Sequence, residues 1–251
     1  QTEKDFLNNY KDDAFEKPTV TVNMVILRFD KLREKLQILF VERQAYPEKG
    51  KWALPGNFLE LNELTEEACL KETRKLTQTD ITEDDIEQLY TFSTPYRDQR
   101  GWFISVAYLV FLPEDKQTVS IEEKTVAWFD VEVTSVAPLE ISLYNQQRSL
   151  SYDFNLGEDK KRIAFDHAEF ISLAMKRIAN KLYYDPIALK LLDNIFTIRQ
   201  TCSLYEQLLG RKTKLDNSNQ LRKLKHFIVE VGERVESRKG RPQKEYTVKK
   251  E

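Results

Sequence analysis

The chain has 251 residues, which suits one large or two modest domains, because a single core usually stops growing near roughly 250–300 residues. Hydrophobic residues make up 41% and aromatic residues 11% of the sequence, and these fractions exclude a disordered or fibrous protein. No apolar run approaches the roughly 20 residues that cross a bilayer, and the first residues do not resemble a secretory leader. Cys69 and Cys202 are far apart in sequence, so we expect no disulfide framework and a location in the reducing cytoplasm.

Charge is divided unevenly along the chain, although the formal net charge is only -2. Residues 211–251 contain 13 Lys and Arg against 6 Asp and Glu, whereas the remaining residues contain 26 against 35. A basic segment following an acidic body can be no more than a solvated surface, or it can be a surface that meets phosphates. The elements predicted for this segment favour the second interpretation.

The first predicted elements are strands. Thr19–Phe29 and Leu36–Val41 are rich in β-branched and aromatic residues and are joined by a charged turn, so we expect a hairpin. Between later strands lies a helical pattern over Glu63–Leu76, with Thr65 as its expected cap. The later strand-like runs are Leu89–Tyr96, Trp102–Leu112 and Thr125–Val131. Strands on both sides of one short helix predict an α+β fold with a mixed sheet, not a Rossmann fold.

Two further segments complete the first part of the chain. Leu139–Lys161 lacks a clear period, which predicts a long surface insertion. Ala168–Tyr183 has apolar residues at helical spacing, so one face of this helix should be buried. Asp166 is expected to cap that helix and Phe165 to act as its hydrophobic staple. His167 is interpreted as structural, because no other metal-ligating side chain is near it in sequence.

The basic segment follows two predicted helices. Asp185-Pro186 opens a short apolar helix, and Phe196–Leu209 forms the next, between a capping Thr197 and the terminating Gly210. A third helix begins near Asp216 and turns its leucines inward. Its outward residues are expected to be Asn219, Gln220, Arg222, Lys223 and Lys225. A polar, basic helix face of this kind suits a DNA major groove.

Two strand-like runs, FIVEVGERVE and KEYTV, follow the third helix. The tip between them carries Arg238, Lys239 and Arg241 beside a glycine and a proline. The order of these elements predicts a winged helix that contacts phosphates or a minor groove. The order is two helices, a basic helix, a strand, a basic tip and a second strand. The alternative is a winged helix that binds protein.

Lys51–Thr79 resembles the Nudix hydrolase box and the W-x-L-P-G-G-F segment that leads into it. The family box is Gly, five residues, Glu, seven residues, then Arg-Glu-apolar-x-Glu-Glu-x-Gly. Along this pattern the chain places Asn57, Glu63, Lys71, Glu72, Lys75, Leu76 and Gln78. The family's paired carboxylates present hard oxygens to Mg²⁺, and here Lys75 and Leu76 replace that pair. The resemblance with these substitutions implies a domain without catalytic residues or a metal site.

Tyr96–Trp102, with the sequence YRDQRGW, resembles a segment of Nudix proteins that handle ADP-ribose and of regulators derived from them. Arginines clamp a pyrophosphate in bidentate fashion and an indole stacks on adenine. The alternative is a charged turn before a strand, with Trp102 in the core. The resemblance implies effector binding by Phe58, Glu72, Arg97, Asp98, Arg100 and Trp102.

The whole chain resembles the Nudix-related transcriptional regulators of the NrtR type, with the AFDH motif at Ala164–His167 as a further match. This implies a Nudix fold over residues 1–184, with a mixed sheet between helices, and a winged helix-turn-helix domain over residues 185–251.

The function that this resemblance implies is a repressor of NAD-metabolism genes. Such a regulator would be a homodimer, would bind double-stranded DNA at a palindromic operator, and would need no cofactor or membrane. Its effector would be ADP-ribose or a related nucleotide or sugar. Residues 133–162 depart from the family pattern by their length. Two other readings stay open, an active ADP-ribose pyrophosphatase with an accessory basic domain and a scaffold that binds no DNA.

Overall fold

A computed structural model describes residues 2–11, 15–113, 125–155, 157–182, 184–210, 216–234 and 242–249. The expected wing-tip residues Arg238, Lys239 and Arg241 lie outside these ranges. Within them, no helix is long and apolar enough to cross a membrane.

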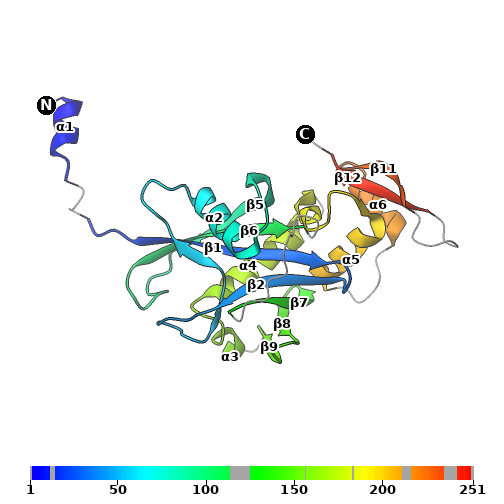
Figure 1. Ribbon diagram of the computed structural model, residues 1–251, viewed down its shortest axis with the longest axis horizontal. Helices are drawn as coiled ribbons and strands as arrows, with labels where there is room; N and C mark the ends of the chain where they lie inside the picture. The colour runs from blue at the N-terminus through cyan, green and yellow to red at the C-terminus, as the bar shows by residue number, and fades with distance from the viewer. Residues whose placement is uncertain are drawn as a thin grey trace.

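The body of the protein is one mixed sheet with the strand order β5-β6-β1-β2-β7-β8-β9 (Figure 1). Its long strands are β1 (Thr19–Asp30), β2 (Lys35–Glu42), β5 (Ile86–Phe92), β6 (Phe103–Leu112), β7 (Val126–Val136), β8 (Leu139–Asn145) and β9 (Leu150–Asp153). The predicted hairpin is confirmed, since β1 and β2 pair antiparallel, and β1 pairs parallel with β6. Two short strands, β3 (Trp52–Ala53) and β4 (Gly56–Phe58), pair with β2 and β1.

Helices cover both faces of the sheet, as the α+β prediction requires. Successive residues of a strand point to opposite faces, so Met24 and Ile26 of β1 pack with α2 (Thr65–Thr77) in one core cluster. Val25 and Leu27 pack on the other face with α4 (His167–Lys181). The short helices η1 (Glu83–Asp85) and α3 (Gly157–Lys160) precede β5 and α4, and α1 (Glu3–Asn9) lies apart from the body in Figure 1.

The expectation of a surface insertion over Leu139–Lys161 is wrong. This segment supplies β8 and β9, which extend the sheet beyond β7. Ile141, Leu143 and Tyr152 are buried in the main core. The sequence does not alternate between apolar and polar residues here, because a polar residue, Asn145, is also buried. Its Nδ2 donates to the Trp128 carbonyl at 2.9 Å.

Two predicted helix caps need correction. Helix α2 begins at Thr65 itself, and the N–H of the preceding Leu64 donates to the Glu67 carboxylate at 3.2 Å. Asp166 occupies the N-cap position of α4, but its side chain makes no capping hydrogen bond. The predicted buried face of α4 is confirmed, with Ile171, Ala174, Met175, Ile178 and Leu182 all buried.

The C-terminal elements form the predicted winged-helix pattern. They are η3 (Pro186–Leu191), β10 (Phe196–Thr197), α5 (Ile198–Leu209), α6 (Asn217–Leu224), β11 (Ile228–Arg234) and β12 (Gln243–Val248), with the sheet order β10-β12-β11. Thr197 caps α5 as expected, and Gly210 ends it with a φ of 62°. A Cβ on Gly210 would lie 2.4 Å from the Val133 carbonyl oxygen, so a glycine is required where α5 meets β7. Helix α5 and η3 therefore pack directly against strands of the large sheet.

Candidate functional site

Three arginines from separate segments meet in one pocket beside β4. Arg43 follows β2, whereas Arg97 and Arg100 belong to the loop between β5 and β6. The complete lining is Thr21, Asn23, Arg43, Ala53, Leu54, Gly56, Asn57, Phe58, Arg97, Asp98, Arg100, Phe165 and His167, around a cavity volume of about 120 Å³. We call this site the arginine pocket. A Cβ on Gly56 would lie 2.1 Å from Nδ2 of Asn23, so only glycine allows this close approach of β4 to β1.

Arg97 is the most deeply held of the three, with a side chain only 6% exposed. Its Nε and Nη2 donate to the two Asp166 carboxylate oxygens at 2.9 and 2.7 Å. Its guanidinium also lies over the Phe170 ring, 5.4 Å from the centroid. This bidentate pair explains why Asp166 does not cap α4, and it ties the β5–β6 loop to the first residues of that helix.

Arg100 pairs with a carboxylate from its own loop. Its Nε and Nη2 donate to Asp98 at 3.0 and 2.7 Å, and the Arg100 backbone N–H donates to the same carboxylate at 2.9 Å. Burial opposes ionisation of Asp98, but these bonds outweigh it and hold the pKa of that carboxyl below its usual range. The Arg100 guanidinium lies over the rings of Phe103 and Phe58, at 4.8 and 5.5 Å.

Arg43 and Phe165 are further parts of the pocket lining. The Arg43 guanidinium lies 4.7 Å from the Phe165 ring centroid, and its Nε donates to the Pro47 carbonyl at 2.8 Å. Burial, and then repulsion from Arg100, lower the pKa of Arg43. Phe165 has a φ of 54°, a conformation that residues other than glycine rarely adopt and that is common at functional sites. Uncompensated positive charge in this pocket favours an anionic ligand.

His167 is buried beneath the arginines. Its Nδ1 accepts a hydrogen bond from the Leu54 N–H at 3.0 Å, so the neutral ring carries its proton on Nε2. Burial, followed by the positive charges of Arg97 and Arg43, lowers the pKa of His167 to about 3. The ring ties the turn before β4 to the start of α4, which is the structural role predicted for it.

The positions of the Nudix box on and before α2 do not suit a divalent cation. Glu63 accepts from Lys71 Nζ at 2.5 Å, and Lys71 also donates to Glu60 at 3.0 Å. Glu72 is buried, and both of its carboxylate oxygens accept from Lys75 Nζ, at 3.2 and 3.3 Å. Each matching carboxylate thus faces an ammonium group instead of a second carboxylate. Across the described ranges, no group of three or more His, Cys, Asp or Glu side chains is arranged to hold a metal ion.

Helix α6 presents the predicted basic face, with one exception. Asn219, Arg222, Lys223 and Lys225 are exposed. Gln220 was expected among them, but its side chain is only 3% exposed, because it lies one turn before the buried Leu224 on the same face of the helix. A side chain facing the core cannot contact a base edge, so Gln220 does not belong to the exposed basic face.

Comparisons with known proteins agree with this architecture. A family model of the NUDIX domain matches residues 17–151, and one of the NrtR DNA-binding winged helix domain matches residues 188–248. The chain belongs to the NUDIX family. It combines that domain with an NrtR-type winged helix, as the sequence motifs predict.

Three relatives are similar to this NUDIX family member over most of its chain. The ADPR responsive transcriptional repressor NtrR of Acinetobacter baylyi is 28% identical over 211 residues, which cover 83% of this chain and 74% of the repressor. A MutT/nudix family protein from Enterococcus faecalis is 34% identical, with a TM-score of 0.86 over 100% of this chain and 94% of its own. NrtR from Shewanella oneidensis, crystallised with a 27mer DNA, shares the fold at 24% identity and a TM-score of 0.70, covering 92% of this chain and 93% of its own. The NUDIX domain of the same protein, crystallised with ADP ribose, is 27% identical with a TM-score of 0.50 over 71% of this chain and 99% of its own.

The residues expected to bind an effector are only partly brought together. Arg97, Asp98, Arg100 and Phe58 line the arginine pocket, whereas Glu72 and Trp102 do not. Trp102 is 51% exposed, so the alternative that places it in the core is wrong, whereas effector binding by Glu72 and Trp102 stays a prediction. Sequence reasoning missed Arg43 and assigned Phe165 to helix capping. The only signal for Arg43 was a cation directly after a buried strand.

Proposed function

We propose that this chain is a DNA-binding transcriptional repressor of NAD-metabolism genes, whose Nudix-type domain binds ADP-ribose or a related nucleotide or sugar. The observation that carries the proposal is the contrast within one domain. Arg43, Arg97 and Arg100 converge on a pocket, while Lys75 and Leu76 stand where the family's metal-binding carboxylates belong. Such a pocket can recognise a diphosphate without cutting it. The same family's ADPR responsive repressor supports this choice of effector.

The pairing of the arginines suggests how a ligand enters. At about 120 Å³ the arginine pocket is smaller than the roughly 300–1,000 Å³ usual for ligand sites, so a nucleotide must displace what now fills it. The carboxylates of Asp98 and Asp166 each hold one guanidinium by two hydrogen bonds. A pyrophosphate offers the same bidentate acceptor geometry with more charge and can replace either carboxylate. We expect ligand binding to release at least Asp166.

In this proposal, release of Asp166 changes the position of the winged helix, because α4 connects the two. Asp166 stands at the start of α4, and Lys181 at its end donates to Asp185 at 3.0 Å. Asp185 in turn caps η3 by accepting from the Ile187 N–H at 3.0 Å. In this proposal residues 1–184 sense the effector and residues 185–251 read DNA. An effector that releases DNA must bind the DNA-free form more tightly.

The proposed regulator acts in the cytoplasm as a homodimer that presents two copies of α6 to a palindromic operator, because a twofold protein matches a twofold site. It needs no metal and catalyses no hydrolysis, since the ammonium of Lys75 neutralises the carboxylate of Glu72. The rival reading is a working ADP-ribose pyrophosphatase whose basic domain is accessory.

One experiment separates the two readings. Duplexes selected from a random pool by the full chain define the operator, and fluorescence anisotropy then follows operator binding while ADP-ribose is added. We expect saturable release of the duplex, and no AMP from ADP-ribose incubated with Mg²⁺ or Mn²⁺. Release of AMP at ordinary enzyme rates, about 1–1,000 per second, together with no salt-dependent DNA binding would overturn the proposal.

A further inference from the structure

A second cavity adjoins the arginine pocket at the start of α4. Its volume is about 380 Å³, within the roughly 300–1,000 Å³ usual for small-molecule sites. It is lined by Pro47, Glu48, Tyr96, Arg97, Gln99, Lys160, Lys161, Phe165, Asp166, Ala168 and Glu169. Arg97 and Phe165 line both cavities, so the two lie side by side. We call this second site the side pocket.

Residues with left-handed backbone gather around the side pocket. Glu48, Tyr96 and Phe165 have φ angles of 65°, 62° and 54°. They are three of the seven residues other than glycine that have positive φ in the described part of the chain. This conformation costs free energy in bulky residues, and it clusters at ligand and active sites. The Tyr96 ring is also 96% exposed, so packing of the core does not account for its position.

Carboxylates give the side pocket hydrogen-bond acceptors. Asp166 is the N-cap residue of α4, and Glu169 lies in the first turn of that helix. Glu169 is exposed, and its carboxylate has no hydrogen bond or ion pair to the residues that the structure describes. Carboxylate oxygens accept from hydroxyl groups, and in dinucleotide-binding folds an acidic side chain holds a ribose hydroxyl in this way. The side pocket therefore suits a ligand group that carries hydroxyls.

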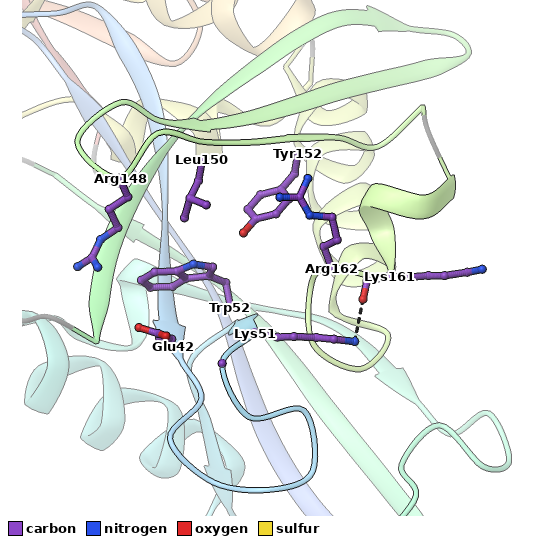
Figure 2. A pocket seen from close by; sticks show the side chains of 9 residues that line it. Glu42, Lys51, Trp52, Arg148, Leu150, Tyr152, Lys161 and Arg162 are labelled. Atoms are coloured by element: carbon purple, nitrogen blue, oxygen red, sulfur yellow. Dashed lines mark hydrogen bonds between the residues drawn. The ribbon is translucent and has the colours of Figure 1, made fainter.

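A third cavity, beside β9, is separate from the side pocket (Figure 2). Lys161 is the one described residue that lines both. Its side chain points away from the third cavity in Figure 2, while its carbonyl oxygen accepts from Lys51 Nζ at 2.8 Å. The Lys161 ammonium therefore belongs to the edge of the side pocket, where it favours a ligand that also carries phosphate.

The side pocket supplies the room that the arginine pocket lacks. At about 120 Å³ the arginine pocket is too small for a whole nucleotide. The side pocket continues from it past Arg97, whose partner Asp166 a diphosphate is expected to release. A group attached to that diphosphate would then meet Tyr96 and Glu169. Most of the lining residues are charged or carry an amide, which suits sugar hydroxyls better than a purine held between apolar faces.

We propose that the side pocket binds a ribosyl group joined to the diphosphate of the effector. Glu169 accepts from the hydroxyls of the sugar, and the sugar ring packs against Tyr96. This inference rests on the proposed function, because it assigns the diphosphate to the arginine pocket. It adds the feature by which the site selects its effector, since a nucleoside diphosphate that ends at its phosphates leaves the side pocket empty.

Comparison of ADP-ribose with ADP tests the side pocket. The two ligands share the adenylate and the diphosphate and differ in the second ribose. Both are titrated into the full chain by calorimetry. We expect ADP-ribose to bind at least tenfold more tightly than ADP, although ADP carries more negative charge toward the arginines.

Variants then assign that preference to the side pocket. Glu169→Gln should weaken ADP-ribose binding about tenfold and leave ADP binding unchanged, because ADP has no second ribose. Tyr96→Gly should act in the same direction, since glycine adopts a φ of 62° without strain and only the ring is lost. Glu132→Gln, an equal charge change at an exposed residue of β7, is the control and should leave both affinities unchanged.

Three results overturn this inference while the proposed function stands. The first is equal affinity of the parent chain for the two ligands, and the second is ADP-ribose binding that neither variant changes. The third is an equal loss for both ligands in Glu169→Gln, which would place the adenylate in the side pocket. Absence of ADP-ribose binding by the parent chain would contradict the proposed effector itself, so the two failures are told apart.

Discussion

The arginine pocket and helix α2 belong to the same domain but use ion pairs in opposite ways. In the pocket, the buried Arg97 and the exposed Arg100 are the proposed recognition groups, and carboxylates of the chain occupy the places that the proposal gives to a ligand's phosphates. On α2, Glu72 is the buried group of the Nudix box, and Lys75 occupies the place of a second metal-binding carboxylate. The arginine pocket therefore presents guanidinium groups suited to an anionic ligand. On α2, by contrast, the ammonium of Lys75 neutralises the carboxylate of Glu72.

This difference is possible because separate elements hold the two regions. The arginines come from the end of β2 and from the β5–β6 loop and rest on Phe165 and Phe170 at the start of α4. None of those contacts involves α2. Substitutions at Lys75 and Leu76 can therefore remove metal chemistry without moving the recognition groups. The proposed function requires that nucleotide binding and hydrolysis be separable in this fold.

Breaking the buried pair of the pocket should have the largest effect. Arg97→Ala leaves the Asp166 carboxylate largely buried without its partner, which typically costs about 3–5 kcal/mol. We expect the free energy of unfolding, measured in urea, to fall by about 3 kcal/mol and ADP-ribose binding to be lost. Arg97→Ala/Asp166→Asn should recover part of the stability but none of the binding. Unchanged ADP-ribose affinity in a folded Arg97 variant would remove this residue from the effector site.

Replacing Lys75 and Leu76 by the carboxylates of the family pattern should give α2 a metal site. Lys75→Glu places a carboxylate beside Glu72, and Lys75→Glu/Leu76→Glu completes the family pair. We expect at least a 100-fold gain in Mn²⁺ affinity by calorimetry, equivalent to about 2.7 kcal/mol. Lys176→Glu on α4 is the control for charge alone. Tight Mn²⁺ binding by the parent chain would contradict the proposed loss of the metal site.

A third substitution tests whether helix α6 contacts DNA. Arg222→Ala removes an exposed guanidinium from α6 and should weaken operator binding by about 1–3 kcal/mol if it contacts a base. Gln220→Leu is the matched control on the same helix, because Gln220 is buried and its Nε2 has no hydrogen-bond partner among the described residues. It should leave DNA affinity unchanged. Equal losses in both variants, measured by anisotropy, would indicate damage to the helix in place of lost DNA contacts.

The sequence predicted the elements better than it predicted the pocket. Local signals such as the Thr197 cap, Gly210 and the apolar face of α4 are carried by neighbouring residues, and the structure confirms them. The strand pair β8–β9 was missed because buried polar residues such as Asn145 interrupt its alternation. Burial against a neighbouring strand cannot be read from one segment alone.

The site itself depends on contacts between distant residues. Arg97 meets Asp166, 69 positions away, and that pairing takes the carboxylate from the helix cap that local rules assign to it. Motif likeness located Arg97 and Arg100, but it also included Trp102, whose side chain does not line the pocket. Arg43 joins the pocket through the pairing of β2 with β3, which no motif records.

The smallest expected effect concerns pH and tests whether the arginine pocket is built on a neutral histidine. Burial and the neighbouring arginines lower the pKa of His167 to about 3 from 6.5, so between these values the unfolded chain binds a proton that the folded chain does not. Stability from this residue is therefore fully present above pH 6.5 and lost as pH falls toward 3. At pH 5.5 the free energy of unfolding should be about 1 kcal/mol lower than at pH 7, since each pH unit is worth about 1.4 kcal/mol. His167→Gln can still accept the Leu54 N–H but does not titrate, so its urea unfolding should lack this part of the loss. An identical pH dependence in both chains would show that His167 is charged in the folded protein, and the positive charge of the pocket would then be greater than its arginines alone supply.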